Sequence, residues 1–284
     1  MQELDDYIDK VKSLPPAPRI LPELLTLLRQ DDVDSDRVVK LIAFDPAITA
    51  AVLRLCNSAY FAGAAPASDL QEAVTRLGFK QVYQLVAAVT GSKMLGPAQK
   101  GYGIDSGELW EHSVVAAVAA QLIAKSCGDS ENESVAFTAT LLHDIGKIIL
   151  AEALEHIYEE LVENSQNQQT PLIETEKRLL GVQHAEIGGR LLARWNFPPN
   201  IVSAVWHHHE PAGAQPHEKL AAYVYLGNMV SYFMGFGYGH HAFAMRGRTD
   251  ALDILNLKPE CLPDYMIKTF EQLQLVQSLV KINS

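Results

Sequence analysis

The stretch TATLLHDIGK, residues 138–147, decides how this sequence folds and where its chemistry lies. It places a histidine and an aspartate side by side, His143 and Asp144, inside a run of aliphatic residues. An ionisable pair in such surroundings needs a charged partner, a metal ion or a shifted pKa, because burial penalises an isolated charge. Together the imidazole nitrogen and the carboxylate oxygen form a donor pair that divalent first-row metals accept. The pair is therefore the first candidate for a metal centre.

Helical patterns extend on both sides of this stretch. Apolar residues recur at intervals of three and four, with proline and glycine between the segments, and we find no convincing run of alternating strand residues. The sequence predicts an all-α fold, a helical bundle in two parts. Helices are expected over residues 20–28, 37–44, 48–55, 73–77, 82–89, 109–125, 133–142, 184–195, 199–208 and 218–234, with one more beginning near residue 171 and amphipathic helices after about residue 252.

Glycine and proline cluster between residues 95 and 107, where the helical period is lost. This predicts an N-terminal helical subdomain of residues 14–100 and a metal-site helical subdomain of residues 101–250. The C-terminal helices, residues 251–284, are expected to pack on the domain rather than to bind a partner. Two segments, SDLQ at 68–71 and SENE at 130–133, have the form of capping boxes and predict helix starts.

Composition limits the class of protein. The 284 residues include 23 Lys and Arg against 34 Asp and Glu, a formal net charge of −11, which argues against general nucleic-acid binding. A hydrophobic content of 48% excludes a disordered chain. Cys56, Cys127 and Cys261 are odd in number and widely spaced, so we expect buried free thiols in a reducing compartment. No signal-peptide core is present and the longest aliphatic run, residues 114–124, is too short to cross a bilayer, so we expect a cytoplasmic protein without a membrane partner.

The ten histidines are unevenly placed. None precedes His112, and the second half also contains His184 and the run at residues 207–209. Helical bundles build metal sites in their cores from side chains on several helices, so these histidines are candidate ligands beside residues 143 and 144. Each also has a purely structural interpretation. His184 suits the first turn of a helix, and the histidine run suits a helix C-terminus, where cations favour the dipole.

These motifs carry a family resemblance. LLHDIGK at 141–147, preceded by EHS at 111–113 and followed by HAE at 184–186, resembles the HD superfamily of metal-dependent phosphohydrolases. VWHHHEP at 205–211 resembles the two-histidine segment of its HD-GYP branch, which is associated with cyclic-di-GMP hydrolysis. The first half narrows the match, because DPAIT at 45–49, LRLCNSAYF at 53–61 and AVTRLG at 73–78 are similar to the HDOD family, the HD-related output domain of bacterial signalling. The resemblance covers about residues 14–234.

The resemblance implies roles for individual residues. In the superfamily a first histidine, the His-Asp doublet and a final aspartate bind the metal, and two-metal sites add further histidines. Lys147 matches the lysine that meets a substrate phosphate, so it joins His143 and Asp144 as a residue expected in catalysis. The metal set that the resemblance implies is His112, His143, Asp144, His184, His208 and His209.

The sequence departs from the superfamily in two places. Asn228 stands where the final aspartate is expected, and a neutral amide oxygen is a weaker metal ligand than a carboxylate. PAGA at 211–214 stands where the GYP element of the HD-GYP branch would follow the histidines.

Three functions remain open at this point. The first, which we favour, is a signalling or regulatory module that binds a partner protein or a nucleotide or phosphate ligand. The second is an active phosphohydrolase or phosphodiesterase that uses Fe, Mn or Mg to activate water. In the third, the histidines are only buried structural groups.

Overall fold

The structure, a computed structural model, describes residues 2–11, 18–28, 33–58, 69–155, 171–237 and 248–280, together with residues 30, 61, 66 and 67. In this part of the chain it is built of helices, and the only extended pairing is an isolated bridge between Gln99 and Ile104. The predicted all-α class is confirmed. The α-helices are α1 (Gln2–Lys10), α2 (Ile20–Leu28), α3 (Ser35–Ala43), α4 (Pro46–Cys56), α5 (Leu70–Leu77), α6 (Phe79–Leu95), α7 (Glu108–Ser126), α8 (Glu133–Leu141), α9 (Gly146–Leu154), α11 (Leu172–Leu180), α12 (His184–Arg194), α13 (Pro199–Trp206), α14 (Glu218–Phe233), α15 (Asp250–Ile254) and α16 (Leu262–Val280).

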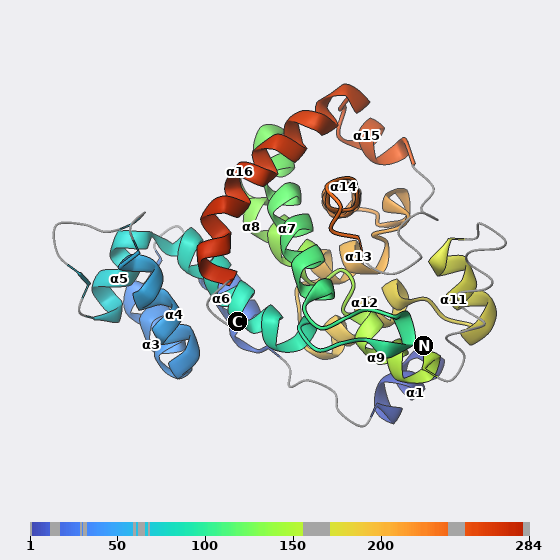
Figure 1. Ribbon diagram of the computed structural model, residues 1–284, viewed down its shortest axis with the longest axis horizontal. Helices are drawn as coiled ribbons and strands as arrows, with labels where there is room; N and C mark the ends of the chain where they lie inside the picture. Colours follow the sequence, from blue (N-terminus) through green and yellow to red (C-terminus); the bar gives the residue numbers. More distant parts are fainter. Residues whose placement is uncertain are drawn as a thin grey trace.

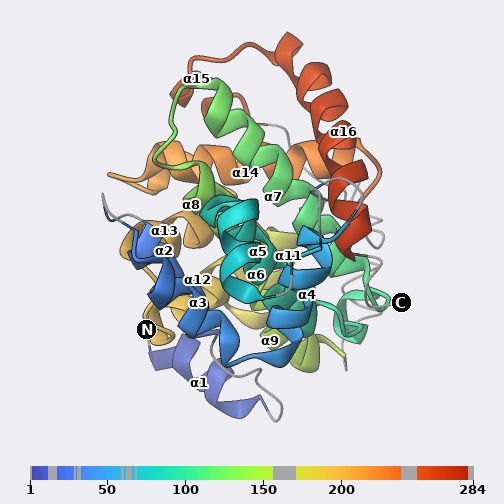
Figure 2. The same ribbon diagram turned by 90° about the vertical axis from the view of Figure 1, so that its left-hand side faces the viewer.

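Helices α3, α4 and α5 form a lobe at one side of the molecule (Figure 1), and Figure 2 shows it from the front together with α2. Each of these three helices begins after an aspartate whose carboxylate accepts backbone N–H groups of the first turn: Asp34, Asp45 and Asp69. Pro46 occupies the first turn of α4, as expected. Gly78, with a φ of +79°, ends α5 where the sequence predicts an end.

The two predicted capping boxes are wrong in detail. At α5 the capping side chain is Asp69, which accepts from the N–H of Glu72, and Ser68 lies outside the described residues. At α8 the N-cap is Asn132, and it makes no side-chain capping bond. Its amide instead donates to the Asp129 carboxylate within the preceding turn, so a local turn bond replaces the cap.

The larger lobe is organised around α7, on which α8, α14 and α16 pack (Figure 1). Helices α7 and α14 approach very closely at Gly227. A β-carbon there would lie 2.5 Å from the carbonyl oxygen of Ala116 and 2.8 Å from the Ala120 β-carbon. Glycine at this position lets the two backbones pack, which brings the first turns of α7 next to the last turns of α14.

Helix α1 was not expected from the sequence. It lies against α9 and α12 (Figure 1), although α2 follows it in the chain. Arg190 and Arg194 on α12 form ion pairs with Asp5 and Asp9, at 2.6 and 2.7 Å. These partners are about 185 residues away in the sequence, so the acidic first segment gives no local sign of where it docks.

The sequence predicts that the three cysteines are buried. This prediction is right for Cys56 and wrong for Cys127, which is exposed just after α7, and for Cys261, which is partly exposed.

One segment, Glu133–Glu152, is apolar and long enough to cross a membrane, but 89% of its apolar window is buried inside the protein. It contains α8, the His-Asp doublet and most of α9, so its apolar character serves the core.

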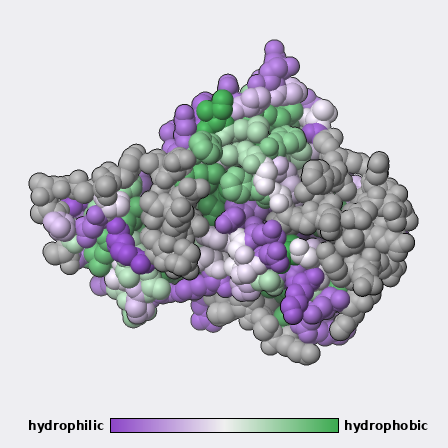
Figure 3. All heavy atoms as spheres, viewed as in Figure 1, coloured by the Kyte–Doolittle hydropathy of each residue, from purple (hydrophilic) through white to green (hydrophobic). Residues whose placement is uncertain are grey.

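Helix α16 packs on α7 and α14 through one face, with Tyr265, Thr269 and Leu273 buried. Its other face leaves Ile267 and Phe270 58% and 57% exposed. Apolar atoms gather on the upper face of the molecule in this region (Figure 3).

Candidate metal centre

Two clusters of potential metal ligands lie in the core of the larger lobe. In each, one ligand atom per residue lies within 4.8 Å of the others. The first is His112, His143 and Asp144, and the second is His184, His208 and His209. The structure therefore brings together all six residues of the predicted metal set, from α7, the α8–α9 turn, the start of α12 and the turn after α13. Their role as ligands stays a prediction.

The ends of α8 and α13 hold their histidines in the same way. His143 follows α8 and its Nδ1–H donates to the carbonyl oxygen of Thr140, at 2.6 Å. His208 follows α13 and its Nδ1–H donates to the carbonyl oxygen of Val205, at 2.7 Å. The last carbonyls of a helix lack helical partners, so each accepts the ring proton of the histidine three residues later. Because a carbonyl can only accept, the tautomer is fixed and the Nε2 lone pair is left for another group.

The Nε2 atoms of His143 and His208 are the observation that favours a metal. Both residues have no exposed surface, and neither Nε2 atom has a hydrogen-bond partner among the described residues. On α7, the Nδ1–H of His112 likewise donates to a backbone carbonyl oxygen, that of Phe236, at 2.9 Å, so this ring has the same tautomer. Three buried imidazoles with inward Nε2 lone pairs fit a metal ion, which requires neutral imidazole as its ligand.

Asp144 lies between the two clusters and is 1% exposed. Its Oδ2 lies 3.4 Å from His143 Nε2 and 3.9 Å from His112 Nε2. Its Oδ1 lies 3.2 Å from His184 Nε2 and 3.8 Å from His208 Nε2. Each carboxylate oxygen therefore faces one cluster, the arrangement by which one carboxylate can serve two ions.

Lys147, expected to meet a substrate phosphate, is 2% exposed and donates to Asp144 Oδ2 at 2.6 Å. The ammonium and the carboxylate thus form a buried ion pair. Burial acts to raise the pKa of Asp144, but its interactions with His143, with the Lys147 ammonium and with His184 outweigh burial and hold that pKa well below its usual range.

Burial sets the protonation of the histidines. It lowers the pKa of His112 to about 3 and holds those of His208 and His209 well below the ordinary value. Burial lowers the pKa of His143 as well. These four rings are neutral at pH 7 and ready to act as ligands. His184 differs, because the Glu176 carboxylate opposes the effect of burial and raises its pKa.

Glu176, on α11, is a site residue that the sequence did not indicate. It has no exposed surface, and it accepts hydrogen bonds from the backbone N–H and the Nδ1–H of His184, both at 2.8 Å. Tyr102 donates a third, at 2.8 Å. A carboxylate that accepts the outer N–H of a ligating imidazole orients the ring and makes it a stronger ligand. Tyr102 comes from the glycine-rich segment that the sequence assigned to a domain boundary.

Helix α12 is held against α9 by glycine. A β-carbon at Gly146 would lie 1.9 Å from the carbonyl oxygen of His184 and 2.7 Å from the N–H nitrogen of Gly188. Because no side chain fits there, Gly146 allows the start of α12 to pack closely on α9, which brings His184 near Asp144.

Asn228 lies on α14 and is 2% exposed. Its Oδ1 has no hydrogen-bond partner among the described residues. Ser231, one turn further along α14, donates to the carbonyl oxygen of His112 at 3.1 Å, so this face of α14 adjoins the first cluster. This buried amide oxygen is therefore on the face of α14 that adjoins the centre. An aspartate at this position would offer the centre a charged ligand.

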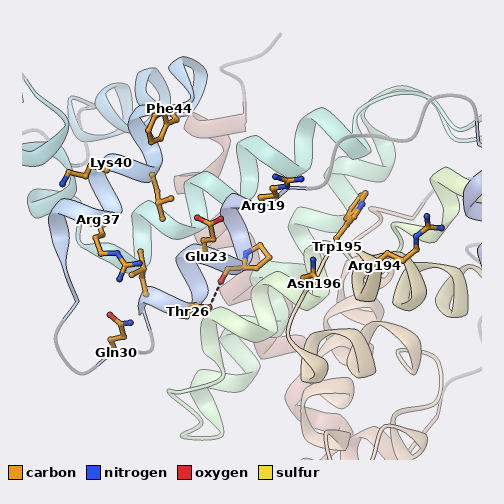
Figure 4. A pocket seen from close by; sticks show the side chains of 13 residues that line it. Arg19, Glu23, Thr26, Gln30, Arg37, Lys40, Phe44, Arg194, Trp195 and Asn196 are labelled. Carbon is orange, nitrogen blue, oxygen red and sulfur yellow. Dashed lines mark hydrogen bonds between the residues drawn. The ribbon is translucent and has the colours of Figure 1, made fainter.

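A separate groove of about 720 Å³ lies between α2, α3 and the end of α12 (Figure 4). Arg37 and Lys40 of α3 line it and form no ion pair within the described part of the chain, whereas Arg194 is paired with Asp9. Phe44, 87% exposed, stands at its rim. The lining residues are Arg19, Pro22, Glu23, Thr26, Leu27, Gln30, Arg37, Lys40, Leu41, Phe44, Arg194, Trp195 and Asn196.

An all-α bundle whose core joins a His-Asp doublet to histidines from three other places in the chain defines an HD-type helical protein. The chain belongs to the HDOD family, since the model of the HDOD domain matches residues 14–211.

A relative and two solved structures are similar to this chain. An uncharacterized protein of Treponema pallidum (strain Nichols) is 27% identical over 227 residues, 80% of this chain, and the chain spans less than half, 44%, of that protein. The fold is similar to a candidate signal transduction protein of Marinobacter aquaeolei VT8, with a TM-score of 0.75, 21% identity, and coverage of 98% of this chain and 64% of that one. It is also similar to a candidate phosphohydrolase of Shewanella amazonensis SB2B, with a TM-score of 0.71, 23% identity, and coverage of 98% and 97%.

Proposed function

We propose that this chain is a regulatory HDOD module of the cytoplasm whose HD-type centre binds a divalent metal and does not turn over substrate. The observation that carries the proposal is the closure of the centre. His112, His143 and His208 have no exposed surface, and Asp144 and Lys147 are 1% and 2% exposed. A phosphate ester cannot reach a metal held there without opening of the core, whereas an ion can be retained and can hold together segments that lie far apart in the sequence.

The lysine supports the same conclusion. An ammonium that acts on a substrate phosphate must be free to meet it, but Lys147 is engaged with Asp144 in the buried ion pair. Asn228 in place of a carboxylate lowers the negative charge that would hold a metal and activate its water. When bound, the metal would supply Lewis-acid chemistry, and the ligands would be the six residues of the two clusters.

The second candidate is a phosphohydrolase or phosphodiesterase using Fe, Mn or Mg. The presence of two ligand clusters that share Asp144 favours it, because paired metals suit displacement at phosphorus. For this function the core has to open around His209, the partly buried member of the set.

As the module's partner we propose a signalling protein or a nucleotide or phosphate ligand. The groove beside α2 and α3 supports an anionic one. Four of its lining residues are cationic and one, Glu23, is anionic, in a chain of net charge −11.

The test is hydrolysis of p-nitrophenyl phosphate and bis(p-nitrophenyl) phosphate by the chain loaded with Mn²⁺, Fe²⁺ or Mg²⁺. A His143→Ala/Asp144→Ala double variant serves as the control. The proposal predicts bound metal in the wild type and the same background turnover in both proteins. Metal-dependent turnover that disappears in the double variant would establish the enzyme instead.

A further inference from the structure

We infer that the two halves of the centre are unequal, and that the chain holds its tightly bound metal at His184, His208, His209 and Asp144 Oδ1. We call these four donors the tight half of the centre. The remaining donors, His112, His143 and Asp144 Oδ2, form the weak half, which binds an ion weakly. This inference rests on the proposed metal binding and says where in the centre the ion lies.

The number of donors separates the two halves. The tight half offers three clustered imidazoles, and Asp144 Oδ1, which lies 3.2 Å from His184 Nε2 and 3.8 Å from His208 Nε2, completes four donors for a first-row divalent ion. The weak half offers two imidazoles and one carboxylate oxygen. Its fourth position falls to Asn228, whose neutral amide adds no charge.

The spacing in the tight half is close to what a metal requires. His184 Nε2 lies 2.9 Å from His209 Nε2 and 3.2 Å from Asp144 Oδ1. Ligand atoms bound tetrahedrally at about 2.0–2.1 Å from an ion lie about 3.3 Å from one another, so His184, His209 and Asp144 are close to that spacing. His208 has to move further, because its Nε2 lies 3.8 Å from Asp144 Oδ1. Two imidazole nitrogens that face each other at 2.9 Å need either a shared proton or an ion between them.

Charge separates the halves further. Lys147 Nζ lies 2.6 Å from Asp144 Oδ2, so the oxygen of the weak half is already engaged by a cation that repels a metal. The tight half has the opposite neighbour. The Glu176 carboxylate, without exposed surface, accepts the Nδ1–H of His184 and places a negative charge behind that ligand. Both effects favour an ion on the same side of Asp144.

The experiment compares three single variants with the wild type: His209→Ala in the tight half, His112→Ala in the weak half, and His207→Ala as a matched control from the same histidine run. Each full-length protein is loaded with Zn²⁺ or Co²⁺, dialysed against a weak chelator and measured by elemental mass spectrometry. The Co²⁺ forms are also recorded by visible absorption, whose intensity distinguishes a tetrahedral ion from an octahedral one.

We expect close to one equivalent of metal and a tetrahedral Co²⁺ spectrum in the wild type, in His112→Ala and in His207→Ala. His209→Ala should bind at least 10-fold more weakly. Asn228→Asp, which adds a carboxylate to the weak half, should raise the metal content above that of the wild type.

Loss of metal in His112→Ala with retention in His209→Ala overturns the inference and leaves the proposed function intact. Equal loss in both variants overturns it too, since it would mean that the halves bind together. A wild type that binds no metal overturns the inference and the proposed metal binding at once. Because His209 is partly buried, its alanine variant is expected to fold, and circular dichroism verifies this.

Discussion

Replacing Glu176 by glutamine keeps the shape of the side chain and removes its charge. The carboxylate accepts three hydrogen bonds at 2.8 Å, from the Tyr102 hydroxyl and from the backbone and ring N–H groups of His184. The glutamine carbonyl can accept only part of this set, and its NH₂ group then faces a donor in a site without exposed surface.

A lost hydrogen bond to a buried charged group costs about 1.5–3 kcal/mol. For a chain of this size that corresponds to a fall in melting temperature of roughly 3–12 °C. Loss of the carboxylate behind His184 should also weaken metal binding by about 10- to 100-fold.

The assay is thermal unfolding by circular dichroism of the metal-free protein, together with metal titration of the folded protein. Glu174→Gln is the matched control, because Glu174 lies on the same helix with its side chain exposed. If Glu176→Gln melts and binds metal like the Glu174→Gln control, the carboxylate does not position His184 and the reasoning fails.

Three further predictions concern packing, pH and metal. Gly146→Ala should lower the melting temperature by several degrees, because its β-carbon would lie 1.9 Å from the His184 carbonyl oxygen. Gly188→Ala, whose closest contact is 3.2 Å, should lower it less. Equal effects of the two variants would contradict the close packing of α9 on α12 at Gly146. Burial lowers the pKa of His112 to about 3, so below pH 6.5 the unfolded chain takes up a proton that the folded chain refuses. Urea unfolding of the metal-free protein should therefore show stability lost as pH falls from 6.5 towards 3, by about 1.4 kcal/mol per pH unit from this group, and a flat profile would refute it. In buffer with a free metal concentration of 100 times the Kd, removal of the metal by a chelator should lower the free energy of unfolding by about 2.7 kcal/mol. The His143→Ala/Asp144→Ala variant should not show this difference.

The helices of the lobe formed by α3, α4 and α5 could be predicted because neighbouring residues in the sequence determine where these helices begin and end. Asp45-Pro46 starts α4 and Gly78 ends α5, each through a backbone or capping requirement that a few neighbouring residues express. The histidines and Asp144 could be found because ionisable residues stand out in apolar segments. Their assembly into two clusters needed the fold, since the residues are spread along the chain from His112 to His209.

Other features have no local signal. Glu176 lies in an amphipathic helix among other charged residues, and its hydrogen bonds to His184 and Tyr102 distinguish it from the exposed Glu174. Tyr102 lies in a glycine-rich segment that has the composition of a linker. Helix α1 depends on Arg190 and Arg194, far along the chain. In each case a long-range partner decides the role of the residue.

The most direct test of the metal centre is a crystal structure of the Zn²⁺-loaded protein with anomalous diffraction collected on both sides of the zinc absorption edge. The account predicts a dominant anomalous peak bound by the Nε2 atoms of His184 and His208, by His209 and by Asp144 Oδ1. No peak among these side chains, or a dominant peak between His112 and His143, would contradict it.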